Sequence, residues 1–331
     1  MTTSLSVDKR ISAARREPTL NVYVERIRDV ADGVVSLSLV SVDGRPLPPW
    51  EPGAHIDLQL AEGLVRQYSL CGDPDDTMRW QIAVLRVPDS RGGSEWIHTR
   101  LREGDRLRVR GPRNNFPLVP AAGYVFIAGG IGITPLLPML KTLEARPGTK
   151  WQLFYGGRRR ASMAFVPALE RFGDKVTIWP EDECGLLDLD AILGKPQVGV
   201  AIYACGPESM LQAVERQCRS WPSGALHMER FQPHAGLAED RLDEPFQVVA
   251  ARSGVVVDVA ADQTIVGALE KHGVNIPVSC GAGVCGTCIT RVLDGIPDHR
   301  DAVLTEEERA TGEVMTPCCS RAYTARIVLD V

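Results

Sequence analysis

The sequence has no excess of positive charge, no long apolar run and no apolar segment at its start, and each absence excludes a class of protein. Its 37 Lys and Arg are outnumbered by 42 Asp and Glu, which gives a net charge of −5. We therefore expect neither nucleic acid nor an anionic membrane as a partner. The most apolar stretch, residues 124–140, is too short for a bilayer and is broken by glycine and proline. The first ten residues do not form a signal peptide, so we expect a cytoplasmic protein.

The cysteines carry the most specific pattern in the chain. Cys280, Cys285 and Cys288 follow the C-x4-C-x2-C spacing, and Cys318 lies 30 residues further on. This is the spacing of a plant-type [2Fe–2S] ferredoxin, in which each iron takes two thiolates. Zinc sites favour paired C-x2-C units on both sides, whereas the second half here is Cys318 alone or the adjacent pair with Cys319. A disulfide framework is disfavoured by the length of the chain and by the lack of an export signal.

The pattern of apolar residues divides the chain into three folded segments. The first alternates apolar and polar residues with Gly and Pro between short runs, which predicts a small antiparallel barrel. The second alternates apolar strands with helices, which predicts a parallel α/β sheet. A polar stretch without periodicity then reads as a linker before the cysteine-containing segment. The predicted domains are 18–117 (barrel), 118–231 (α/β), 232–245 (linker) and 246–331 (ferredoxin).

Individual elements follow from the same periodicities. The expected strands are 21–25, 34–40, 55–60 and 106–110 in the barrel, 124–128, 151–155, 176–179 and 198–203 in the α/β segment, and 246–250, 255–259 and 327–331 in the last segment. The expected helices begin near 95 and after 132, and cover 164–172, 208–220 and 265–272.

A flavin motif stands on a predicted barrel strand. Arg66 and Tyr68 are two residues apart, so they share one face, where a guanidinium can hold phosphate and a phenol ring can pack on an isoalloxazine. Ser69 can offer its hydroxyl near the flavin N5. The second part of the motif precedes a helical run, where glycines expose N–H groups to a phosphate: Arg91, Gly92, Gly93 and Ser94. The simpler alternative is a surface strand with an extended arginine.

A nicotinamide motif follows the buried strand at 124–128. The loop Gly129-Gly-Ile-Gly-Ile-Thr-Pro135 opens a helix, as a pyrophosphate cradle does, and Gly130, Gly132, Thr134 and Pro135 are the candidate contacts. It departs from the G-x-G-x-x-G pattern, and a tight strand–helix turn is the alternative. A second loop at a strand end should lie across the sheet from it, with Cys205, Gly206 and Pro207. Cys205 either packs on the nicotinamide or is an ordinary buried cysteine.

The adenosine end of the coenzyme is expected at the strand that ends in Gly157. Arg158, Arg159 and Arg160 follow it, and three arginines could bind the 2′-phosphate of NADPH. A solvated loop is the simpler reading for at least two of them. No acidic residue directly follows this strand to hold a 2′-hydroxyl, so the sequence leaves the coenzyme open.

The order of these motifs resembles the phthalate dioxygenase reductase and vanillate demethylase reductase family. The resemblance covers about residues 20–331 and extends to Tyr68-Ser-Leu-Cys71, Asp298-His-Arg-Asp301 and Ser320-Arg-Ala322. It implies a ferredoxin-reductase-like barrel and α/β pair, and a C-terminal β-grasp ferredoxin domain. It also implies NADH as donor, FMN and a [2Fe–2S] cluster. The register of Ser320-Arg-Ala322 implies that Cys318 is the fourth ligand and Cys319 an extra residue.

The resemblance also assigns residues around the flavin. FMN would contact Arg66, Gln67, Tyr68, Ser69, Ala83, Val84, Leu85, Arg91, Gly92, Gly93, Ser94 and Thr134, and Phe231 would cover its face where the nicotinamide enters. Phe231 could instead be a capping core residue. Ser69, Cys205 and Phe231 would then lie near the site of hydride transfer, and the chain needs no general base or covalent nucleophile.

The function that follows is the reductase component of a two-component Rieske-type oxygenase or demethylase, which we expect to be a monomer. The alternatives are a stand-alone NAD(P)H diaphorase for quinones or ferric chelates, a reductase for another type of oxygenase, and a non-catalytic redox or zinc module. In the last segment Asp and Glu outnumber Lys and Arg, and Glu306, Glu307 and Glu308 are its densest acidic cluster. They are either part of an acidic docking face or the start of a helix capped by Thr305.

Overall fold

The computed structural model describes residues 17–60, 64–88, 92–232 and 243–331. Pro18–Glu229 form one compact unit, and Arg230–Val331 belong to a second. The first unit contains the barrel strands and the α/β segment, and the second contains the cysteine loop. The predicted linker falls largely on residues 233–242, which lie outside the described residues, and the four predicted domain boundaries stay predictions.

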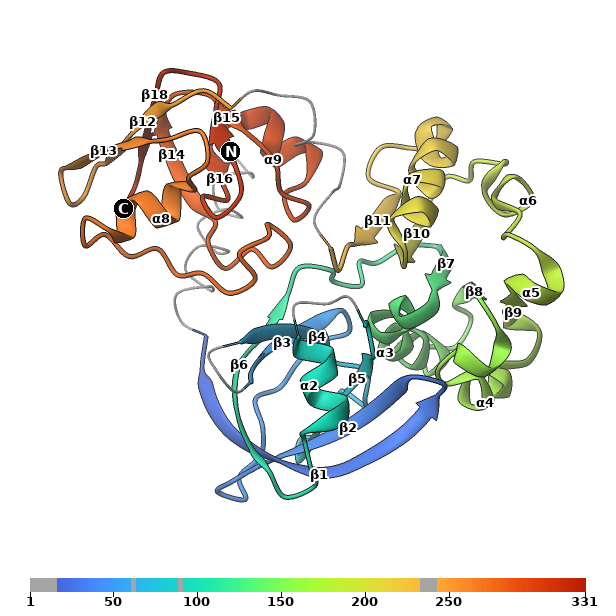
Figure 1. Ribbon diagram of the computed structural model, residues 1–331. Coiled ribbons are helices and arrows are strands. Elements are labelled where there is room, and N and C mark those ends of the chain that lie inside the picture. Colours follow the sequence, from blue (N-terminus) through green and yellow to red (C-terminus); the bar gives the residue numbers. More distant parts are fainter. Residues whose placement is uncertain (1–16, 61–63, 89–91, 233–242) are drawn as a thin grey trace. The chain divides into compact units, whose positions relative to one another are not determined.

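Six antiparallel strands form the barrel, in the order β4-β3-β6-β1-β2-β5 (Figure 1). Alternate residues of these strands face a core that includes Leu37, Ile56, Leu58 and Trp80, as the period-two pattern predicts. Helix α2 packs against β5 and buries Ile97. The strands are β1 (Thr19–Ala31), β2 (Val34–Ser41), β3 (Ala54–Gln59), β4 (Val65–Ser69), β5 (Arg79–Leu85) and β6 (Arg106–Asn114), and the helix is α2 (Gly93–Thr99).

Five parallel strands form the second sheet, in the order β11-β10-β7-β8-β9 (Figure 1). All seven residues of the central strand β7 are buried, which explains its uninterrupted apolar run. The strands are β7 (Gly123–Gly129), β8 (Lys150–Gly157), β9 (Val176–Pro180), β10 (Val200–Cys205) and β11 (Leu226–Glu229). The helices are η2 (Gly130–Gly132), α3 (Ile133–Glu144), η3 (Arg160–Ser162), α4 (Val166–Leu169), η4 (Glu170–Lys175), α5 (Glu181–Cys184), α6 (Leu189–Leu193), α7 (Glu208–Gln217) and η5 (Cys218–Ser220).

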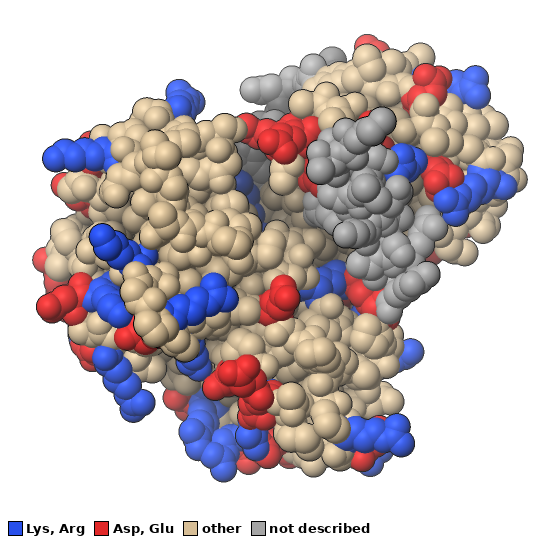
Figure 2. Space-filling view, turned by 180° about the vertical axis from the view of Figure 1, so that it is seen from behind, with Lys and Arg blue, Asp and Glu red and all other residues tan. Residues whose placement is uncertain are grey.

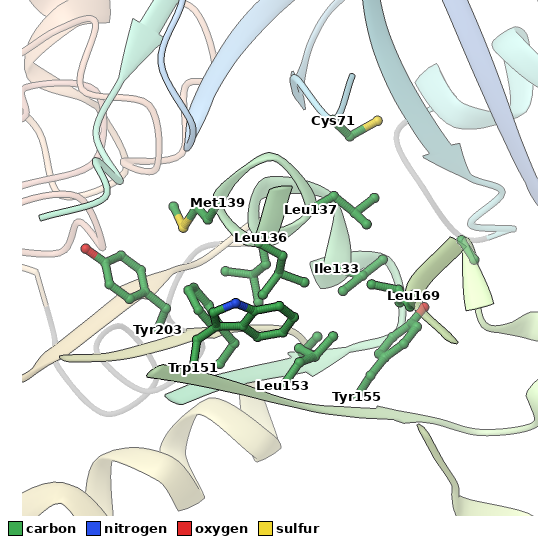
Figure 3. Packing of buried hydrophobic residues seen from close by; sticks show 14 of the residues in the cluster. Cys71, Ile133, Leu136, Leu137, Met139, Trp151, Leu153, Tyr155, Leu169 and Tyr203 are labelled. Atoms are coloured by element: carbon green, nitrogen blue, oxygen red, sulfur yellow. The ribbon is translucent and has the colours of Figure 1, made fainter. Parts of the chain in front are cut away.

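A single apolar core joins the barrel to the parallel sheet within this unit. Figure 3 shows α3 between Cys71 of the barrel segment and the β8 side chains Trp151, Leu153 and Tyr155. Ala83 of β5 belongs to the same buried cluster. The carboxyl ends of the parallel strands are therefore held at a fixed position against the barrel strands that carry the flavin motif.

The second unit contains a mixed sheet in the order β13-β12-β18-β14-β16 and a separate pair, β15-β17 (Figure 1). Strands β12 and β18 are parallel, and β13 and β14 join them antiparallel. Cys288 and Cys318 belong to the apolar core of this unit. The elements are β12 (Phe246–Ala250), β13 (Val255–Val259), α8 (Ile265–Glu270), β14 (Thr290–Asp294), β15 (Pro297–Asp298), α9 (Glu306–Thr311), β16 (Val314–Met315), β17 (Arg321–Ala322) and β18 (Arg326–Leu329).

Three predicted helices differ from the observed ones for local reasons. The helix expected over 164–172 is an α-helix only over Val166–Leu169, because Phe165 before it has a positive φ of 65° and the turns after it, Glu170–Lys175, are 3₁₀. The helix expected to reach 220 ends its α-helical part at Gln217, since Trp221 precedes Pro222 and adopts an extended conformation. Helix α2 begins at Gly93 rather than at Glu95, so the flavin motif is itself the first turn.

Two further features concern the charge of the surface and the apolar character of the helices. On the face drawn in Figure 2, basic and acidic side chains are interspersed and form no large area of one sign. Among the described residues, no helix combines the length and the apolar character needed to cross a membrane.

Candidate functional site

The two halves of the flavin motif meet at Arg66. Arg66 and Tyr68 on β4 stand opposite Leu58 and Ile56 on β3, so they share one face of the sheet. A Cβ placed on Gly93 would lie 2.5 Å from Cγ and from Nε of Arg66. Glycine at this position therefore lets the guanidinium lie against the first turn of α2, where backbone N–H groups are available to a phosphate. Arg91 lies outside the described residues.

The three β5 residues that were assigned to FMN differ in what they pack against. Val84 faces the barrel core, and its carbonyl oxygen is 2.9 Å from Nε2 of His98. This carbonyl therefore already has a hydrogen-bond partner within the protein. Ala83 belongs instead to the core that surrounds α3, and Leu85 packs against that core. Strand β5 also contacts η2, the first turn of the predicted nicotinamide loop. Ser94 accepts a hydrogen bond from the backbone N–H of Val87 at 3.1 Å.

The opposite face of β4 carries Ser69, which reaches the end of the parallel sheet. Its hydroxyl donates to Oε2 of Glu229 at 3.3 Å. Glu229 ends β11, and in the parallel register it stands beside Cys205 at the end of β10. Three polar side chains from the barrel and the parallel sheet are thus brought together at one place.

The protonation of this group is set by burial. Burial raises the pKa of Glu229 to about 8, although the hydrogen bond from Ser69 opposes this. Burial, together with the nearby Glu229, raises the pKa of the Cys205 thiol well above its usual range. Ser69, Cys205 and Glu229 therefore all hold protons at neutral pH. Sequence reasoning missed Glu229; the signal that could have found it is its place at the carboxyl end of a parallel strand.

The two predicted nicotinamide loops touch each other through glycine backbone. A Cβ on Gly132 would lie 2.2 Å from the Cys205 carbonyl oxygen, and one on Gly129 would lie 2.5 Å from Cδ of Pro207. A Cβ on Gly206 would lie 2.9 Å from Cα and from N of Gly129. The loop that opens α3 and the loop after β10 therefore form one surface at the carboxyl end of the sheet, which is where nucleotides bind in open α/β sheets.

Hydrogen bonds fix the shape of the first of these loops. Thr134 donates its hydroxyl to the Ile131 carbonyl at 2.9 Å, and Tyr155 donates to the Gly130 carbonyl at 3.1 Å. Pro135 lies in the first turn of α3, where a missing N–H costs no hydrogen bond.

The arginines after β8 have unequal surroundings. Arg160 forms an ion pair with Glu170 on η4. The side chains of Arg158 and Arg159 are exposed, and the Arg158 carbonyl accepts a hydrogen bond from the Asp182 N–H at 3.2 Å. The start of the acidic helix α5 is thereby held next to Arg158. At least one of the three arginines is thus engaged within the protein.

The cysteine loop has the backbone that a cluster requires. Cys285, Cys288 and Cys318 are buried and Cys280 is half-buried. The Cys318 thiol lies within hydrogen-bonding reach of the Cys280 and Cys288 thiols. The glycines between the ligands all have positive φ, at 63° (Gly281), 70° (Gly283) and 72° (Gly286).

Backbone N–H groups of this loop point at the sulfurs. The Ala282 N–H is 3.3 Å from Sγ of Cys280, and the Thr287 N–H is 3.4 Å from Sγ of Cys285. Such donors stabilise thiolate ligands, so the residues fit a cluster. Among the described residues, no three His, Cys, Asp or Glu side chains converge as a single metal ion would require. A two-iron cluster spreads its four thiolates over a larger volume.

Cys319 lies outside this set of four. Its sulfur is 3.3 Å from the Thr316 hydroxyl, and a Cβ on Gly283 would lie 2.5 Å from it. The Cys318 and Cys319 thiols also contact each other, but it is the Cys318 thiol that reaches Cys280 and Cys288.

The comparisons with known proteins agree with this geometry. Residues 248–323 match the family model of the 2Fe-2S iron-sulfur cluster binding domain. The chain is 41% identical to vanillate O-demethylase oxidoreductase from Pseudomonas putida, over 94% of this chain and 99% of that one. The crystal structure of phthalate dioxygenase reductase, which transfers electrons from pyridine nucleotides to [2Fe-2S], matches with a TM-score of 0.70 and 34% identity, over 95% and 98% of the two chains. The chain belongs to this reductase family.

Membership confirms the predicted fold class and the enzyme class. The protein is an iron–sulfur flavoprotein oxidoreductase, and residues 248–323 are its [2Fe–2S] domain. The chain also matches an intact type IV self-sufficient cytochrome P450 monooxygenase, with a TM-score of 0.87 and 44% identity. That match covers 95% of this chain but only 41% of the monooxygenase.

Proposed function

We propose that this chain is the reductase component of a two-component Rieske-type oxygenase or demethylase. FMN is held along β4 by Arg66, Gln67, Tyr68 and Ser69, with its phosphate at Gly92, Gly93 and Ser94. NADH lies over the joined loops of Gly130–Pro135 and Cys205–Pro207. Cys280, Cys285, Cys288 and Cys318 hold the cluster. The one observation that carries this proposal is the contact of Ser69 with Glu229, which joins the flavin strand to the nucleotide end of the parallel sheet.

The chemistry of the bound groups is a conversion between electron pairs and single electrons: FMN takes a hydride equivalent from NADH, and a [2Fe–2S] cluster carries one electron at a time. The protein's own residues supply position and a proton. Glu229 keeps a proton on its carboxyl at neutral pH because burial raises its pKa to about 8. The protonated carboxyl lies beside the flavin strand, where it accepts a hydrogen bond from the Ser69 hydroxyl.

The flavin and cluster assignments are tested by analysis of the purified full-length protein. Heat release and chromatography should identify FMN, and metal analysis should find about two iron atoms for each chain. FAD in place of FMN, or zinc in place of iron in protein produced with adequate iron, contradicts the corresponding assignment.

The coenzyme preference is part of the same proposal. NADH should be preferred over NADPH, since Arg160 is paired with Glu170 and does not need an external anion. The measurement is kcat/KM for flavin reduction with each coenzyme, in the wild type and in Arg158→Ala. A clear NADPH preference that Arg158→Ala removes contradicts this part and assigns Arg158 to the 2′-phosphate.

The partner is the least constrained part of the proposal. A Rieske-type oxygenase is supported by the similarity to phthalate dioxygenase reductase and to vanillate O-demethylase oxidoreductase. A P450 monooxygenase is the second candidate, because of the similarity to part of the self-sufficient enzyme. Oxygenases encoded beside this chain should be purified and mixed with it and NADH. Reduction of a Rieske centre supports the first candidate, and reduction of a haem supports the second. We also propose a cytoplasmic monomer, which gel filtration and cell fractionation test.

A further inference from the structure

His55 lies in the middle of a row of polar side chains that crosses three strands of the barrel. It stands opposite Ser69 of β4 on one side and opposite Arg113 of β6 on the other. Opposite residues of antiparallel strands share a face, so these three side chains lie on the same side of the sheet. The Leu70 N–H donates to the Ala54 carbonyl at 2.8 Å, which makes His55 and Ser69 a non-hydrogen-bonded pair. In such pairs the side chains lie closest together.

The contact with Arg113 fixes which ring nitrogen of His55 carries the proton. The Arg113 Nε–H donates to Nε2 of His55 at 3.3 Å. A guanidinium has only donors, so Nε2 must be the acceptor and carries no proton. Burial, helped by the charge of Arg113, lowers the pKa of His55 to about 3, so the ring is neutral at physiological pH. Its single proton is therefore on Nδ1.

This Nδ1–H donor is buried and has no hydrogen-bond partner within the part of the chain that the structure describes. The His55 residue is only 6% exposed. Native proteins rarely leave a buried donor unpaired, so we expect an acceptor beyond the described residues, and a bound ligand is one such group.

The His55 ring is fixed by contacts on its Nε2 side. Arg113 pairs with the buried carboxylate of Asp57, and Gln67 donates to the same carboxylate at 3.1 Å. Arg113 is 9% exposed and Asp57 3% exposed. This buried ion pair keeps Nε2 of His55 engaged, so the orientation of the Nδ1–H bond is set before any ligand arrives.

We propose that the Nδ1–H of His55 donates a hydrogen bond to a carbonyl oxygen on the pyrimidine ring of the bound flavin. The inference rests on the proposed function, which places the flavin along β4 with its reactive edge at Ser69. The dimethylbenzene edge of an isoalloxazine offers only methyl groups, and the phosphate belongs at the Arg66–Gly93 end. The pyrimidine carbonyls are the acceptors left for the Ser69 end of the strand.

A donor at this place acts on both affinity and redox potential. Negative charge on the pyrimidine ring grows when the flavin is reduced, so a fixed N–H donor binds the reduced form more strongly. His55 is thus a positioning and tuning residue for the flavin, set by an ion pair on the neighbouring strand.

The test compares three substitutions at His55 in the full-length holoprotein. His55→Asn places an amide N–H close to the position of Nδ1, His55→Gln places it close to the position of Nε2, and His55→Leu removes both. FMN release on dilution, followed by flavin fluorescence, gives the Kd, and an anaerobic dye titration gives the midpoint potential. His272→Asn is the matched control, because its Nδ1 bonds the Ala268 carbonyl on α8.

We expect FMN to bind about tenfold more weakly in His55→Leu and His55→Gln, and within about threefold of the wild type in His55→Asn. If the donor favours reduced flavin tenfold, His55→Leu lowers the two-electron midpoint potential by about 30 mV. Equal Kd and potential in all four proteins overturn the inference, and so does a loss in His55→Asn as large as that in His55→Gln. The two amide variants preserve the test if His55→Leu does not fold. A wild-type protein without FMN would instead overturn the proposed function.

Discussion

The cluster loop and the flavin strand assemble their functional groups over different distances in the sequence. In the cluster loop, the N–H donors to Cys280 and Cys285 come from residues two positions away. In the barrel, Ser69 on the flavin strand β4 contacts Glu229, 160 residues further along the chain, and His55 on the neighbouring strand β3 contacts Arg113 at a separation of 58 residues. The donors of the cluster loop are therefore determined by residues close together in the sequence. The flavin site, in contrast, forms only when the barrel and the parallel sheet have folded together. We therefore expect a substitution of a cluster ligand to abolish cluster binding, and substitutions around the flavin to change affinity or rate gradually.

The largest expected effect is at the fourth ligand. Cys318→Ser should lose the iron and the visible absorption of the cluster, while Cys319→Ser keeps both. The reason is that the Cys318 thiol reaches the Cys280 and Cys288 thiols, whereas the Cys319 thiol contacts Thr316, Ser320 and Cys318 itself. Iron analysis and absorption spectra of the two purified variants decide this. A cluster retained in Cys318→Ser and lost in Cys319→Ser reverses the assignment.

The next effect is at the junction of the nucleotide loops. In Gly132→Ala the new Cβ would lie 2.2 Å from the Cys205 carbonyl oxygen, so the two loops must move apart. We expect a cost of about 1–3 kcal/mol in stability and a KM for NADH raised about tenfold or more. Gly123→Ala on β7, the strand that leads into this loop, is the matched control, because the nearest neighbour of its Cβ would be 3.5 Å away. Equal KM values in both variants would show that the loops are not the coenzyme site.

The third prediction tests whether Glu229 contributes through the proton on its carboxyl. Its pKa is about 8, above the usual 4.5, so its proton is present at pH 7 and is lost as pH rises through about 8. Flavin reduction by NADH should slow above pH 8 in the wild type. Glu229→Gln should be slower on the order of 100-fold at pH 7 and insensitive to pH in this range.

The same pKa gives a stability test that does not depend on turnover. Between about pH 4.5 and 8 the folded chain binds a proton that the unfolded chain releases, so stability falls as pH rises through this range. The Tm of the wild type should therefore fall relative to that of Glu229→Gln between pH 6 and pH 9. Parallel Tm curves for the two proteins would mean that Glu229 is ionised throughout.

The smallest effect concerns the acidic cluster of the ferredoxin domain. Thr305 caps α9, and Glu308 is buried and accepts the Thr305 N–H at 2.9 Å in a capping box. Glu308→Ala should therefore cost about 1 kcal/mol in stability. Glu306 and Glu307 are exposed.

Within this cluster, Glu306 and Glu307 are the exposed glutamates that can contact a docking partner. Their replacement by Gln should slow electron transfer to the partner about two- to threefold at low salt, with little effect at high salt. Stopped-flow transfer rates across a salt series measure this, with Glu308→Ala as the stability control. An electron-transfer rate that does not change with salt concentration would contradict the acidic docking face.

The sequence predicted what depends on spacing and periodicity. The [2Fe–2S] domain that the cysteine spacing predicts is confirmed by the family match over residues 248–323, whereas the four individual ligands stay predictions. The alternation of apolar residues identified the barrel and the parallel sheet. Glu229 and His55 were not predicted, because their roles depend on cross-strand pairing and on burial. The ends of α4 and α7 differed, since the chain continues from both as 3₁₀ turns, Glu170–Lys175 and Cys218–Ser220, which the apolar periodicity does not distinguish from an α-helix. The assigned FMN and NADH contacts, Phe231 among them, stay predictions. Phe231 is 41% exposed.

The central claim is that electrons from NADH reach the cluster through the flavin of the same chain. Its most direct test is EPR of the full-length protein after anaerobic addition of NADH, beside a sample reduced chemically. The wild type should show the signal of a reduced [2Fe–2S] centre in both samples. Cys318→Ser should show it in neither, although NADH still bleaches its flavin. A wild-type cluster that is reduced chemically but not by NADH would contradict the account.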